Sequence, residues 1–115
     1  MIATSTTTAK ATARAVRLWI EGAKLTAAGF NPDTTYKLWE RNITSQLWER
    51  NITSQRRIIL IVSNNGERRV TKAMRNGKPR PIIDLHSKEV AEIFPAGTKV
   101  RVEYHPNKII FTEES

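Results

Sequence analysis

The chain of 115 residues contains no cysteine, so it has neither a disulfide framework nor a thiolate-bound zinc or iron–sulfur site. It lacks any apolar run of about 18 residues, which excludes a membrane-spanning helix. Its start also lacks the hydrophobic stretch of a secretory signal. We therefore expect a cytoplasmic protein with no membrane partner. At this length, a single domain is expected.

Acidic residues are nearly absent from the middle of the chain, where cations are concentrated. The chain has 19 Lys and Arg against 11 Asp and Glu, a net charge of +8. Residues 56–80 carry eight of these cations and a single acid, Glu67. Such clustering favours binding to nucleic acid, although charge runs also occur as ordinary solvated surfaces. The candidate nucleic-acid-binding residues are Arg14, Arg17, Arg56, Arg57, Arg68, Arg69, Lys72, Arg75, Lys78 and Arg80.

The patterning predicts a disordered tail over residues 1–13, rich in Thr and Ala, and one domain over 14–112. Apolar residues alternate over 16–20 as in a half-buried strand, and residues 23–28 suit a short helix. Ser87 is the expected N-cap of a second helix that ends at Phe94. Between the two helical regions, residues 63–79 are predicted to form a basic hairpin with turns at 64–66 and 75–78.

A perfect tandem duplication occupies residues 38–55, where LWERNITSQ appears twice in succession. An insertion of odd length within a continuous strand would turn every later side chain to the opposite face. We therefore expect the extra residues at the tip of a hairpin, as a longer arm or an extruded loop. An alternative is a hinge through which strands swap between chains, which would make the protein a homo-oligomer.

Residues 14–62 and 80–112 share one order of elements: strand, short helix, aromatic residue, turn and two strands. Neither unit is large enough to bury its own apolar faces, so the two are expected to cover each other. The first unit resembles the core motif of SymE-type toxin-like proteins, through Leu18-x-Ile20-x-Gly22-x-x-Leu25-x-x-Ala28-Gly29-Phe30-x-Pro32. The second is similar to the general SpoVT/AbrB pattern, through Ile83-x-Leu85-x-x-x-x-Val90-x-x-Ile93-Phe94-x-x-Gly97-Thr98-Lys99-Val100-x-Val102.

The resemblance implies a mainly β fold with two short helices. In that superfamily, two βαββ units interdigitate as a swapped-hairpin β-barrel, which here would be a pseudo-dimer in one chain. It also implies DNA binding through arginines on one barrel face, as in regulators and antitoxins of toxin–antitoxin systems. The SymE-like alternative is a toxin that acts on RNA, with possible endoribonuclease activity. A third hypothesis is a protein-interaction or strand-swapping module.

The sequence assigns no catalytic residue, metal ligand or cofactor. His86 lies beside Asp84 and Ser87, but adjacency along a strand does not make a catalytic triad, and His105 lies in a turn. Three tryptophans offer a different mode of binding, because exposed aromatic rings can stack on bases. Trp19 is expected to serve in packing. Trp39 and Trp48 are copies of one residue.

Overall fold

The computed structural model describes residues 1–13, 15–46 and 52–114, and these form a mainly β structure with two short helices, as expected. In chain order the elements are β1 (Ala3–Thr8), β2 (Lys10–Ala11), β3 (Val16–Glu21), α1 (Ala23–Ala27), β4 (Thr35–Gln46), β5 (Ile52–Val62), β6 (Arg68–Arg69), β7 (Thr71–Arg75), β8 (Lys78–Ser87), α2 (Lys88–Ile93), β9 (Lys99–His105) and β10 (Lys108–Glu113).

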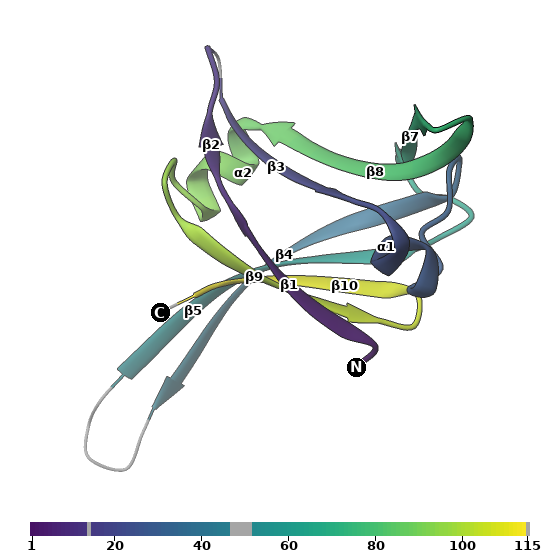
Figure 1. Cartoon of the computed structure of the whole chain (residues 1–115). Coiled ribbons are helices and arrows are strands. Elements are labelled where there is room, and N and C mark those ends of the chain that lie inside the picture. Colours follow the sequence, from purple (N-terminus) through teal and green to yellow (C-terminus); the bar gives the residue numbers. More distant parts are fainter. Residues whose placement is uncertain (14, 47–51, 115) are drawn as a thin grey trace.

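The strands form two sheets that face each other across the core (Figure 1). One sheet has six strands in the order β1-β9-β10-β5-β4-β6, and the other has four in the order β2-β3-β8-β7. Among the described residues, the pairing leaves both sheets open, so the closed barrel that the resemblance implies is not observed.

If β1–β5 are exchanged in turn with β6–β10, each strand order is the same one read from its other end. The first long strands of the two units, β3 and β8, pair with each other, with Leu18 opposite Leu85. The last strands, β5 and β10, also pair, with Ile59 opposite Ile110. Each helix contacts the first long strand of the other unit, α1 against β8 and α2 against β3. The two units therefore share one interior.

The core follows from the predicted alternation. Along β3, Val16, Leu18 and Ile20 are buried, while the intervening side chains face outward. Phe30 and Phe94, which follow the two helices, are both fully buried. Ser87 caps α2 as predicted, because its hydroxyl accepts a hydrogen bond from the backbone N–H of Val90 at 3.3 Å.

The prediction of a disordered tail over residues 1–13 is wrong. Residues 3–8 form β1, which pairs antiparallel with β9 from Ala3 opposite Tyr104 to Thr8 opposite Lys99. The Ser5 hydroxyl also lies 3.0 Å from that of Tyr104. Although the segment lacks large apolar side chains, backbone pairing along the edge of β9 holds it in place.

The basic hairpin predicted over residues 63–79 is confirmed at its second turn, 75–78, where β7 pairs with β8, but it is wrong at its first turn, 64–66, because the chain does not return along β5. Residues 63–67 lead to β6, which pairs with β4, whereas β7 pairs with β8. The physical reason is that β5 already has a partner on each edge, β4 on one side and β10 on the other, so it has no free edge for the returning chain.

The duplication lengthens the β4–β5 hairpin into an arm that projects from the body (Figure 1). Pairing runs without a register break from Tyr36 opposite Val62 to Gln46 opposite Ile52. Within the arm, the ITSQ segment of the first copy (43–46) pairs antiparallel with that of the second (52–55). The extra residues lengthen both strands of the hairpin and its tip. The side chains of β4 and β5 in the body therefore keep their faces, although the repeat has an odd number of residues.

Candidate nucleic-acid interface

The most basic exposed structure of the described chain is the β7–β8 hairpin. Residues 71–80 contain four cations and no acid. The strands turn at Asn76 and Gly77, whose φ angles of 52° and 76° are those of a type I′ turn. This tight turn places Arg75 directly opposite Lys78, so the two side chains share one face at the hairpin tip.

The hairpin and the start of α1 enclose an open groove of about 380 Å³. Three candidate cations, Arg75, Lys78 and Arg80, line it, together with small or uncharged residues from both sides. None of the described lining residues is acidic. Arg80 lies so close to Gly22 that a Cβ there would sit 2.7 Å from its Nη2 atom. The glycine thus leaves room for the guanidinium at the wall of the groove.

Glu21 on β3 lies outside the groove and partly neutralises the positive charge of Arg75 and Arg80. Its Oε2 atom lies 3.5 Å from Nε of Arg80 and 3.9 Å from Nη2 of Arg75. All three side chains are partly exposed, so these ion pairs are weak and open to competition by another anion. A single carboxylate facing two guanidiniums also leaves the group with net positive charge.

The same outer face of the four-stranded sheet extends across β3 to β2. Arg17 forms an ion pair with Asp84 at 3.0 Å, and its guanidinium carbon lies 5.7 Å from the ring centre of Trp19. Lys10 on β2 is paired directly with Arg17. Lys10 was missed from the sequence because it falls in the segment read as a tail. The available signal was the run rich in β-branched threonines at 4–8, a residue type enriched in strands, just before it.

The structure does not bring the remaining candidates to this face. Lys72 lies on the opposite face of β7, paired with Pro81. Four arginines belong to the six-stranded sheet: Arg56 and Arg57 on β5, and Arg68 and Arg69 on β6. Arg56 donates to the carbonyl of Glu92 at 2.8 Å, and Arg69 lies 3.9 Å from a carboxylate oxygen of Asp33. Arg14 lies outside the described residues.

Two tryptophans are partly exposed, on different sheets. The exposed fraction is 38% for Trp19, on the basic face, and 47% for Trp39, on the outer face of the six-stranded sheet. Trp19 therefore lies on the outer face beside Arg17 and not in the core, and its ring is partly open to solvent. Trp48 lies outside the described residues.

The histidines do not assemble a catalytic group. His86 is exposed on β8, with Nε2 2.7 Å from the Thr12 hydroxyl, while the Ser87 hydroxyl is engaged in capping α2. His105 lies on β9 in the other sheet, 3.9 Å from Glu103. Within the described residues, no three His, Cys, Asp or Glu side chains converge on a metal position.

The two helices of the described chain are too short and too weakly apolar to cross a membrane. Comparisons with known protein families, curated proteins and solved structures found no match.

Proposed function

We propose that the chain binds nucleic acid, with duplex DNA as its expected partner, through the β7–β8 hairpin and the adjoining outer face of the four-stranded sheet. The observation that carries the proposal is the groove beside α1, where Arg75, Lys78 and Arg80 gather without an acidic residue in the lining. Phosphate groups bind such clusters of guanidinium and ammonium groups by charge and hydrogen bonding.

The pairing of the two units supports a fold of the SpoVT/AbrB kind. In the proposal, residues 14–62 and 80–112 form the two halves of a swapped-hairpin pseudo-dimer, opened here into two sheets. The symmetric strand orders and the pairing of β3 with β8 and of β5 with β10 agree with that arrangement. Its SymE-like and AbrB-like motifs then favour a DNA-binding regulator or an antitoxin-type module over an enzyme.

The hairpin has a shape suited to duplex DNA. A two-stranded ribbon fits the major groove, where arginine can reach guanine edges. Arg75 and Lys78 flank the turn at the leading end, and Arg80 lies further back beside Gly22. On binding, a phosphate competes with Glu21 for the two exposed guanidiniums. Contacts of this type contribute affinity and strong salt dependence, and base contacts from the tip add sequence preference.

The test measures fluorescence anisotropy with duplex DNA, single-stranded DNA and RNA of one sequence over a range of salt concentrations. The decisive variant is Arg75→Gln/Lys78→Gln/Arg80→Gln. We expect its affinity for duplex DNA to fall at least about tenfold. The slope of log K against log salt should fall by up to about 3, near 0.9 for each lost phosphate contact.

A matched control, Lys99→Gln/Arg101→Gln/Lys108→Gln, removes the same charge from β9 and β10 of the six-stranded sheet. It should change the affinity by less than about threefold if the hairpin is the site. Equal losses in the two variants would show that net charge alone drives binding. Tighter binding of RNA than of duplex DNA would favour the SymE-like alternative, and no binding of any of the three at low salt would refute the proposal.

A further inference from the structure

One edge of the six-stranded sheet is bare over most of its length. β4 is paired with β5 along one edge, but β6 pairs with its other edge only at Thr35 and Tyr36. Just before β6, the chain passes very close to the backbone of Tyr36 at Gly66. Only glycine fits there, because a Cβ would lie 2.5 Å from the N and O atoms of Tyr36. From residue 37 to residue 46, no described strand covers this edge.

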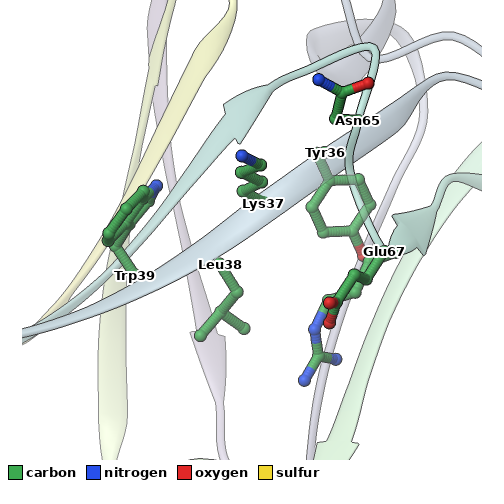
Figure 2. A pocket seen from close by; sticks show the side chains of 7 residues that line it. Tyr36, Lys37, Leu38, Trp39, Asn65 and Glu67 are labelled. Atoms are coloured by element: carbon green, nitrogen blue, oxygen red, sulfur yellow. The ribbon is translucent and has the colours of Figure 1, made fainter.

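At the opposite end of the same sheet, the corresponding edge is covered by a strand. β9 occupies the place that corresponds to β4, and β1 covers it along six residues. In the other half of the molecule, the chain before β6 forms a turn at 64–65 in place of such a strand. The position left open is a concavity of about 420 Å³ lined by Tyr36, Lys37, Leu38, Trp39, Asn65 and Glu67, with Arg68 (Figure 2).

The backbone of this edge is ready to accept a strand. The carbonyl of Thr35 accepts a hydrogen bond from the N–H of Ser63, so odd-numbered residues of β4 direct their backbone groups toward β5. The even-numbered residues from Leu38 to Gln46 therefore direct theirs toward the bare edge. A row of such groups is a template for the addition of another strand.

Apolar side chains lie beside this edge on both faces of the sheet. Trp39 and Ile61 lie on the outer face of the sheet with exposed fractions of 47% and 39%, and Leu38 is half-buried at the concavity. A strand added at β4 would lie next to Trp39 and Leu38 and shield both from water. Exposed apolar surface next to an open sheet edge is typical of an interaction surface.

We propose that the bare edge of β4 pairs antiparallel with the same edge of a second copy of this chain. The occupant is inferred from the arm, where one ITSQ segment already pairs antiparallel with an identical one. A second copy presents the same strand on its own bare edge. Pairing β4 with β4 about a two-fold axis makes both copies equivalent and closes the assembly at a dimer.

The proposal is tested by the mass of the full chain in solution, measured by light scattering and sedimentation over a wide concentration range. We expect a dimer of twice the 13.1 kDa chain mass. Asn42→Pro removes an N–H that faces the bare edge and leaves the pairing with β5 in place. It should raise the dimer dissociation constant at least about tenfold, while the matched control Asn42→Thr should leave it nearly unchanged.

Thr44→Pro makes the same test one edge position further along the arm, and far-UV circular dichroism checks that both proline variants remain folded. A monomer at every concentration would overturn the proposal. So would assemblies that grow beyond the dimer, or a dimer that both proline variants leave intact. Because β4 and the basic hairpin lie in different sheets, duplex DNA binding by Asn42→Pro tests the proposed function separately.

Discussion

The shared interior makes a quantitative prediction about Leu18. This side chain is 1% exposed on β3 of the first unit, and it lies opposite Leu85, which is fully buried on β8 of the second. Leu18→Ala removes three buried carbon atoms and leaves a cavity between the units. Substitutions of this kind cost roughly 3 to 4 kcal/mol where the surroundings cannot collapse. The total stability of a domain of this size is of order 5–15 kcal/mol, so the variant should still fold.

Urea unfolding and amide hydrogen exchange measure the effect. With a urea dependence of about 1.5 kcal/mol/M, the midpoint should fall by about 2 to 2.7 M in a single transition. Protection of the slowest amides should fall equally in β5 and β10, because both units unfold together. Lys99→Ala, at an exposed position on β9, should stay within about 0.5 kcal/mol of the parent chain. Protection lost in the first unit alone, or two separate transitions, would refute the shared interior.

Three further predictions follow from individual contacts. Burial raises the pKa of both tyrosines, Tyr36 and Tyr104, above the ordinary value of 10.0, so absorbance at 295 nm should show them ionising at higher pH in the folded chain than in the urea-unfolded chain. Stability should then decline as pH rises beyond 10.0, because the unfolded chain loses these protons first. Ionisation of the tyrosines at the same pH in the folded and the unfolded chain would contradict this. Ser87→Ala should destabilise the fold by about 1 kcal/mol in urea unfolding, whereas Ser87→Thr should retain most of the cap. Deleting residues 47–55 leaves 43–46 as the hairpin loop, with Asn42 still opposite Arg56. The free energy of unfolding should therefore change by less than about 1 kcal/mol. A large loss would show that the arm supports the core.

Local patterns were sufficient to predict several elements of the fold. The alternation at Val16, Leu18 and Ile20 identified β3 and its buried face, because only a strand places every second residue on one side. Ser87 marked the start of α2 because a hydroxyl at that position satisfies a free backbone N–H. The two related units were visible in the order of their elements, although few residues are identical between them.

The errors arose where long-range pairing decides the structure. β1 has no large apolar residue, and its order comes from backbone bonds to β9, almost a hundred residues away. The Asn64-Asn65-Gly66 turn indicated a local hairpin, but both edges of β5 were already taken by β4 and β10. For the same reason, the basic segment is divided between two sheets. The sequence located the charge but not the groove, because Gly22 and α1 contribute to it from a distant part of the chain.

The most direct test of the proposed interface is an NMR titration of the isotope-labelled chain with a short DNA duplex at low salt. The account predicts the largest chemical-shift changes in residues 71–80 and on the outer face of β3, around Trp19, with little change on β9 and β10. Changes centred on the six-stranded sheet, or none at saturating DNA, would contradict it.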